Sequence, residues 1–152
     1  MVSKVDSTVI VRARRPGPLI PPTINVPGER FRIMQNELTV GEARRLSPSF
    51  LLSIRGRSGE ALTDVSLRQA MELAKELSER TGKRWRVPID KQLLGAFISV
   101  GNELTGKNWE WTRTIDFFDV RYILRKNGRS DHIVAHAEDA KKNFSVRFVT
   151  AK

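Results

Sequence analysis

Apolar residues recur with helical spacing between Ser66 and Gly82, and this pattern predicts the clearest element of the chain. The apolar stripe consists of Leu67, Ala70, Met71, Ala74 and Leu77, which follows the i, i+3, i+4, i+7 rule of a helix that packs on one face. Ser66 and Gln69 match the capping-box pattern at the start of the helix. Gly82 is placed to end it in a left-handed conformation. We therefore expect the stripe to belong to the core.

Two further helices are indicated by their start signals. Thr39 and Glu42 have capping-box spacing and predict a short helix that runs to about Leu46, before Pro48. Asp90 is a candidate N-cap for a helix from residue 91 to about residue 99. Turn residues at Gly101-Asn102 and Gly106-Lys107 then bound a loop.

The remaining apolar segments are typical of short strands. Residues 24–34 predict a short strand pair or one interrupted strand, with Pro27-Gly28 as the turn, and residues 84–87 predict a short extended piece. Trp109 and Trp111 are two apart, so in a strand they share a face that Glu110 does not. Two further strands are predicted at 119–124 and 144–149, with a polar hairpin or loop at 126–143 between them. The rest of the chain indicates a weak strand at 1–12, a proline-rich extended arm at 13–23 and a short apolar run at 50–54.

Composition and charge narrow the class of function. Lys and Arg outnumber Asp and Glu by 27 to 17, which gives a net charge of +10 and favours an anionic partner. The basic excess includes clusters at 12–15, 83–86 and 121–129. The chain has no cysteine, which excludes disulfides and thiolate chemistry, and it has no apolar run long enough to cross a membrane. With no signal-like apolar run near Met1, we expect a cytoplasmic location.

The order of five short motifs resembles the formylglycine-generating enzyme (sulfatase-modifying factor) family. The segment 31–45 is similar to that family's strand, E-V-T and helix opening, and 65–70 resembles its V-S-W-x-x-A helix start. Residues 77–88 resemble L-S-x-x-T-G-x-x-Y-R-L-P, and 104–112 resemble L-G-N-V-W-E-W-T. Residues 144–149 are similar to the terminal G-F-R-x-V strand. Together the motifs cover most of residues 24–150.

This resemblance implies an α+β, C-type-lectin-like fold with two or three short helices and a twisted antiparallel sheet. It implies one domain over residues 24–152, preceded by an N-terminal strand and arm at 1–23. Trp109 and Trp111 would anchor the core, since each tryptophan buries a large area. Arg86 and Arg147 would be structural cations. Their expected partners are carboxylates such as Glu37 or Glu110.

Departures from the family pattern predict a non-catalytic member. The oxidases of the family use a cysteine pair to bind copper, and this chain has no cysteine. The family's R-L-P-T-E-A-E-W-E is replaced at residues 86–94, where Ile89 and Leu93 stand in place of its Thr and Trp. The long insert that holds calcium in the family is replaced by residues 97–104. We expect no enzyme activity and no cofactor.

The leading hypothesis is a binding module that presents loops at 98–108 and 113–143 to a protein or another macromolecule. The candidate ligand-binding residues are Asn102, Lys107, Asn108, Arg113, Tyr122 and Arg125. A minor variant is a variable ligand-binding protein of a diversity-generating retroelement. The alternative is an electrostatic binder of nucleic acid or another polyanion, in which Tyr122 is the plausible exposed stacking position. A residual enzyme would need a metal at His132 and His136. Ligand identity and oligomeric state stay open.

Overall fold

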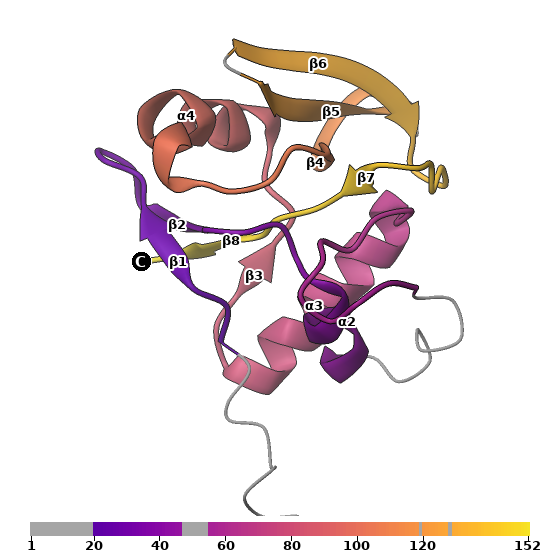
Figure 1. Ribbon diagram of the computed structural model, residues 1–152. Helices are drawn as coiled ribbons and strands as arrows, with labels where there is room; N and C mark the ends of the chain where they lie inside the picture. The colour runs from indigo at the N-terminus through magenta and orange to yellow at the C-terminus, as the bar shows by residue number, and fades with distance from the viewer. Residues whose placement is uncertain (1–19, 47–54, 119, 128) are drawn as a thin grey trace, which may run out of the picture.

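The computed structural model describes residues 20–46, 55–118, 120–127 and 129–152, and it shows an α+β arrangement of two sheets and three α-helices (Figure 1). The possible strand at 1–12, residues 13–19 of the arm at 13–23 and the apolar run at 50–54 lie outside the described residues. In this described part, no helix is both long and apolar enough to cross a membrane.

The first sheet has the strand order β1-β2-β8-β3, and every neighbouring pair is antiparallel. Its strands are β1 (Thr23–Asn25), β2 (Phe31–Met34), β8 (Val149–Ala151) and β3 (Trp85–Arg86). The expected turn between β1 and β2 is present, since the Glu29 amide donates to the Val26 carbonyl oxygen at 3.1 Å. Gly28 adopts φ 79° in this turn, a value that glycine reaches without steric cost.

The second sheet has the order β6-β5-β4-β7. Its strands are β4 (Trp109–Phe117), β5 (Val120–Asn127), β6 (Arg129–His136) and β7 (Phe144–Ser145). β4, β5 and β6 are antiparallel neighbours, whereas β7 pairs with β4 in parallel. For residues 126–143 the sequence allowed a polar hairpin or a loop. The structure shows a hairpin, because β6 pairs with β5 in the first half of this segment.

The helices are α2 (Val40–Leu46), α3 (Leu67–Thr81) and α4 (Asp90–Val100). Both expected capping boxes are present: Glu42 accepts from the Thr39 amide at 2.9 Å, and Gln69 accepts from the Ser66 amide at 3.0 Å. Gly82 ends α3 with φ 73°. The prediction for α4 was wrong by one residue. Ile89 precedes the helix, and Asp90 is its first residue rather than its cap.

Two hydrophobic clusters hold the layers together. One packs α2 and α3 against both sheets around Trp111 and Phe148, and the other packs α4 against both sheets around Ile33 and Leu93. The apolar stripe of α3 is confirmed with one correction. Met71 is 50% exposed, and Leu73 is buried in its place. The core face of α3 is thus rotated slightly from the one that the sequence pattern indicates.

Candidate anion-binding site

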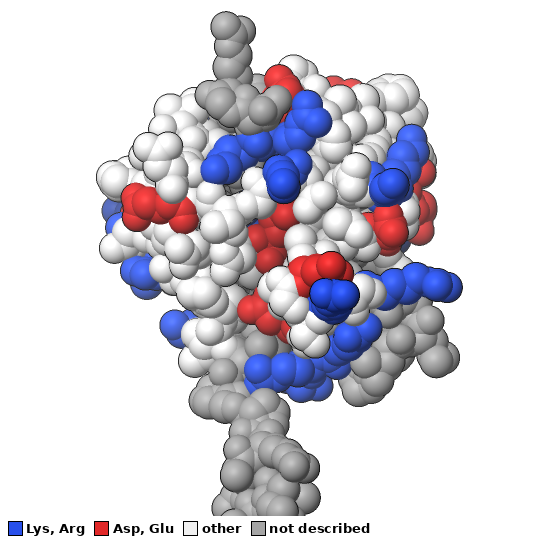
Figure 2. Space-filling model, in the orientation of Figure 1, with Lys and Arg blue, Asp and Glu red and all other residues white. Residues whose placement is uncertain are grey.

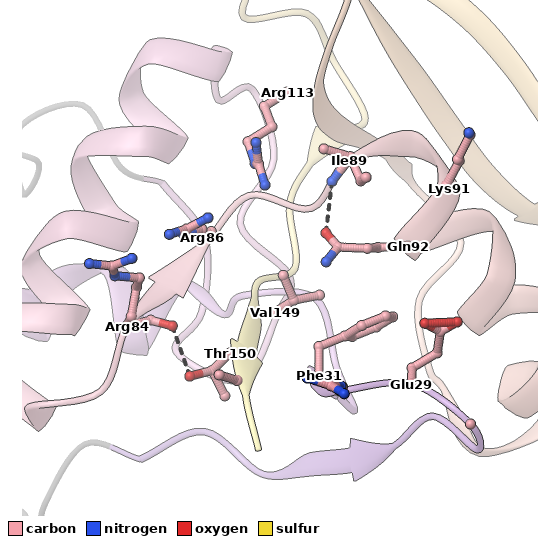
Figure 3. Close-up of a pocket in the computed structure, with 13 residues that line it drawn as sticks. Glu29, Phe31, Arg84, Arg86, Ile89, Lys91, Gln92, Arg113, Val149 and Thr150 are labelled. Atoms are coloured by element: carbon pink, nitrogen blue, oxygen red, sulfur yellow. Dashed lines mark hydrogen bonds between the residues drawn. The ribbon is translucent and has the colours of Figure 1, made fainter.

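A cavity of about 780 Å³ lies where the first sheet meets the start of α4, and its lining is strongly basic. Figure 3 shows this region, which we call the basic hollow. Its cationic lining residues are Arg30, Arg84, Arg86, Lys91 and Arg113, and its acidic lining residue is Glu29. Phe31, Val149 and Ala151 add apolar surface. Five cationic residues and one acidic residue therefore line it.

Strand alternation places two of the arginines. Trp85 is buried in the core, so Arg84 and Arg86 on either side of it share the opposite, solvent-facing side of the strand. The Thr150 hydroxyl donates to the Arg84 carbonyl oxygen at 2.8 Å, which ties this segment to β8. In Figure 3 both guanidinium groups lie along the same side of the hollow.

Arg113 reaches the hollow from the second sheet. Its Nε donates to the Val87 carbonyl oxygen at 2.9 Å, and its amide donates to the Pro88 carbonyl oxygen at 2.9 Å. Burial lowers the pKa of Arg113, and the nearby charge of Arg86 lowers it further. The two guanidinium groups lie near each other in Figure 3. An anion placed between them would relieve their repulsion.

The start of α4 forms the opposite side, where Lys91 projects from the first turn (Figure 3). The first amides of this helix already have partners. Gln92 Oε1 accepts from the Ile89 amide at 3.0 Å, and Thr114 Oγ1 accepts from the Asp90 amide at 2.7 Å. The basic character of the hollow therefore comes from side chains and not from free amides at the helix end.

The cations of the hollow contrast with charges elsewhere. Among the described residues, none of the five forms an ion pair, although Arg68 and Arg125 pair with Glu138 and Asp131. The face seen in Figure 2 likewise carries interspersed basic and acidic groups. Unpaired guanidinium groups are suited to bind carboxylate or phosphate oxygens with two parallel hydrogen bonds.

Arg147 lies in the opposite kind of environment. Its side chain is fully buried, and it holds Glu110 through two bonds, Nε to Oε1 at 2.7 Å and Nη2 to Oε2 at 2.8 Å. Its remaining donors reach the carbonyl oxygens of Met34, Gln35 and Thr105. The charge of Glu110 and its hydrogen bonds outweigh the effect of burial, so the pKa of Arg147 is raised. We call Arg147, Glu110, Glu37 and Asn108 the buried ion centre.

Glu37 is the second carboxyl group of this centre. Its Oε1 and Oε2 accept from the side-chain and backbone amides of Asn108 at 2.8 and 3.2 Å. Burial raises the pKa of Glu37 to about 8, and the charge of Glu110 together with a hydrogen bond between the two carboxyl groups raises it as well. With a pKa of about 8, Glu37 carries a proton at neutral pH, next to the ion pair of Glu110 and Arg147.

The expected structural residues divide into two groups. Trp111 is fully buried and its Nε1 donates to the Val65 carbonyl oxygen at 2.7 Å, and Arg147 pairs with Glu110 as predicted. Trp109 is only partly buried, and the Arg125 guanidinium lies 4.3 Å from its ring centre. The prediction for Arg86 was wrong. This side chain is exposed and lines the basic hollow, because the buried position in β3 belongs to Trp85.

The candidate ligand-binding residues do not gather at one site. Asn102 is exposed on the 3-10 helix η2 (Gly101–Glu103), and Lys107 is exposed in the following loop. Asn108 binds Glu37, and Arg125 pairs with Asp131. Of the six candidates only Arg113 lines the basic hollow.

Tyr122 is half-buried and not an open stacking position. Its hydroxyl donates to Asp116 at 2.7 Å, which raises its pKa, and its ring meets the His132 ring edge-on at 5.9 Å. It lines a small pocket with Asp90, Leu94 and Asp131. The hydroxyl and the ring that the sequence favoured for stacking therefore already have neighbours.

His132 and His136 both lie on β6, so their spacing spans roughly 13 Å along an extended strand and does not fit one ion. Within the described ranges, no group of three or more His, Asp or Glu side chains is placed to hold a metal.

Sequence reasoning missed most of the basic hollow. The cluster at 83–86 was noted, but Arg30 and Lys91 are isolated in sequence and reach the hollow only through the fold. The one local signal is the alternation of Arg84 and Arg86 around an apolar Trp85.

Comparisons with known proteins add no assignment. No model of a known protein family matches the chain, and no curated protein matches it.

Proposed function

We propose that this protein is a non-catalytic binding module that holds an anionic polymer, the sugar-phosphate backbone of nucleic acid, in the basic hollow. The observation that carries the proposal is the gathering of Arg30, Arg84, Arg86, Lys91 and Arg113 around one cavity with Glu29 as the acidic residue of the lining. Guanidinium groups bind phosphate with bidentate hydrogen bonds, and each neutralised phosphate releases counterions.

The proposed scaffold is the C-type-lectin-like fold of the formylglycine-generating enzyme family. The order of the five motifs supports it, and so does the pairing of Arg147 in the last motif with Glu110 in the W-E-W-T motif. Two sheets and three helices are consistent with this scaffold. The absence of cysteine supports a member without the copper chemistry of the oxidases.

A polymer fits the site better than a small anion. The cavity of about 780 Å³ is long enough to touch both sheets, and its cations come from four separate segments of the chain. Arg84 and Arg86 are separated by roughly 7 Å along the strand, since each residue rises by about 3.4 Å. Such spacing offers successive guanidinium groups to successive phosphates. The apolar floor at Phe31 and Val149 can accept sugar carbons.

The test is fluorescence anisotropy with labelled 20-nucleotide DNA and RNA at about 50 and 200 mM salt. We expect micromolar or tighter binding by the natural protein at the lower salt, with a large loss at the higher salt. The variant Arg84→Glu/Arg86→Glu should lose at least tenfold in affinity. Its matched control is Lys141→Glu/Lys142→Glu, which makes the same change of net charge at exposed positions outside the hollow.

Equal losses in both double variants would show that only net charge matters and would contradict a specific site. No binding at the lower salt would overturn the nucleic-acid proposal and would favour the other hypothesis, a protein ligand held by the loops at 98–108 and 113–143. Circular dichroism of each variant establishes that it is folded. We expect the Arg84→Glu/Arg86→Glu variant to fold, because both side chains are exposed.

A further inference from the structure

The turn between β4 and β5 carries the most exposed aromatic side chains of the described residues. Phe117 is 64% and Phe118 is 81% exposed, and Ile115 beside them is 61% exposed. The two phenyl rings contact each other, with centroids 4.3 Å apart and planes inclined at 59°. Large apolar groups gathered at one exposed turn indicate a binding surface.

Phe118 has an unusual backbone conformation. Phe118 adopts φ 49°, which is rare for a bulky residue. Arg121 Nη1 donates to the Phe118 carbonyl oxygen at 2.9 Å, and this bond spans the turn. The carbonyl group of Phe118 is therefore held by a side chain of β5.

The aromatic pair and the basic hollow belong to the same strand. Along β4 the side chains of Thr114 and Asp116 bond to Asp90 and Tyr122, on the side of the strand that faces α4. Arg113 and Phe117 lie in the part of β4 where its pairing with β5 shifts register, between Trp111 and Ile115 and again between Ile115 and Phe117. Arg113 lines the hollow, and Phe117 follows roughly 13 Å further along the strand. That distance corresponds to a few nucleotides of an extended strand.

We propose that the ligand is single-stranded nucleic acid, whose phosphates enter the basic hollow while a base stacks on Phe117 and Phe118. This inference rests on the function proposed above and adds the form of nucleic acid that is recognised. A phosphate-binding groove combined with an aromatic platform is the arrangement by which proteins bind single strands without sequence preference.

The form of the ligand follows from the two surfaces taken together. In a duplex the bases are stacked on one another and paired, so their faces are not free to contact an aromatic ring. A single strand exposes them at no cost of unpairing. An anionic membrane also attracts basic and aromatic groups, but a lipid surface does not enter a concave cavity, where Arg86 and Arg113 face each other.

The experiment compares single-stranded and duplex 20-mers of the same sequence at about 50 mM salt, again by anisotropy. The test variant is Phe117→Ala/Phe118→Ala. Its matched control is Met71→Ala/Ile98→Ala, which removes two exposed apolar side chains from the helices. We expect the natural protein to prefer the single strand. The test variant should lose about tenfold in affinity for the single strand, because bases can no longer stack on the two phenyl rings. Its affinity for the duplex should fall by less than twofold.

The outcomes separate this inference from the proposed function. If the test variant binds the single strand as the control does, while Arg84→Glu/Arg86→Glu does not bind, stacking is refuted and the phosphate site stands. If the natural protein binds neither oligonucleotide, both proposals fail. If it prefers vesicles of 30% phosphatidylserine in phosphatidylcholine, and this binding needs Phe117 and Phe118, the aromatic turn is a membrane contact and the inference is wrong.

Discussion

Arg147 and Arg86 carry the same guanidinium group in opposite surroundings. Arg147 has no exposed surface and uses all its nitrogens on Glu110 and three carbonyl oxygens. Arg86 is exposed, it faces Arg113, and it has no carboxylate partner among the described residues. A buried charge must be paired within the protein, whereas an exposed cation without a partner is available to a ligand. The position of the carboxylates therefore decides which arginine stabilises the fold.

The largest expected effect comes from making the same substitution in both regions. Arg147→Met should lower the free energy of unfolding by about 3–5 kcal/mol, because it leaves Glu110 buried without its partner. Arg86→Met should change it by less than about 0.5 kcal/mol, since surface changes away from special features are small. Urea unfolding followed by circular dichroism measures both values. Similar losses of unfolding free energy in the two variants would contradict the difference drawn between the buried Arg147 and the exposed Arg86.

A second effect tests how tightly the buried ion centre is packed. Gly106 has φ 117°, and a Cβ there would lie 2.6 Å from the Glu37 side chain and 2.8 Å from Arg147 Nη2. Gly106→Ala should therefore cost about 1–3 kcal/mol, through overpacking and backbone strain.

The matched control is Gly95→Ala within α4. A Cβ at Gly95 meets nothing within 4 Å, and alanine favours a helix by roughly 0.8–1.0 kcal/mol over glycine. Urea unfolding should thus move in opposite directions for the two glycine variants. A neutral Gly106→Ala would mean that the centre is open enough to accept a methyl group.

A further effect depends on pH and sharpens the account of Glu37. Its pKa is about 8 in the folded protein against 4.5 for the free side chain, so folding takes up a proton between these values. Its contribution is therefore most favourable at low pH and is lost as pH rises toward 8, by at most about 1.4 kcal/mol per pH unit. The Glu37→Gln side chain stays neutral at every pH. The free energy of unfolding of this variant should therefore rise relative to that of the natural protein between pH 5 and 9. Urea unfolding at pH 5, 7 and 9 measures this difference. A constant difference would contradict the raised pKa.

Much of the fold was predictable because its signals are local. The capping boxes at Thr39 and Ser66, the left-handed stop at Gly82 and the turn at Gly28 are each decided by a few neighbouring residues. The side on which Met71 lies was not predictable, because an unbranched apolar residue at the edge of a stripe fits both core and solvent. Leu73 is buried instead, and this is decided by the tertiary packing of the helix.

The candidate site was much less predictable. Arg30 and Lys91 come together with Arg113 only when both sheets and α4 have formed, and no local sequence pattern predicts that these residues line one cavity. The motif resemblance left Glu37 or Glu110 open as the partner of Arg147, and Glu110 forms the ion pair. It misplaced Arg86, since a motif records residue type and not exposure. The exposure of Phe117 and Phe118 depends on a turn whose conformation the sequence pattern does not reveal.

The most direct test of the account is the salt dependence of single-strand binding by the natural protein and by Arg84→Met/Arg86→Met. Each phosphate neutralised on a single strand contributes about 0.7 to the slope of log affinity against log salt concentration. If both arginines contact phosphates, the double variant should have a slope smaller by about 1.4 while its unfolding free energy is unchanged. An identical slope in the two proteins would show that these arginines do not contact phosphate, and the central claim would be wrong.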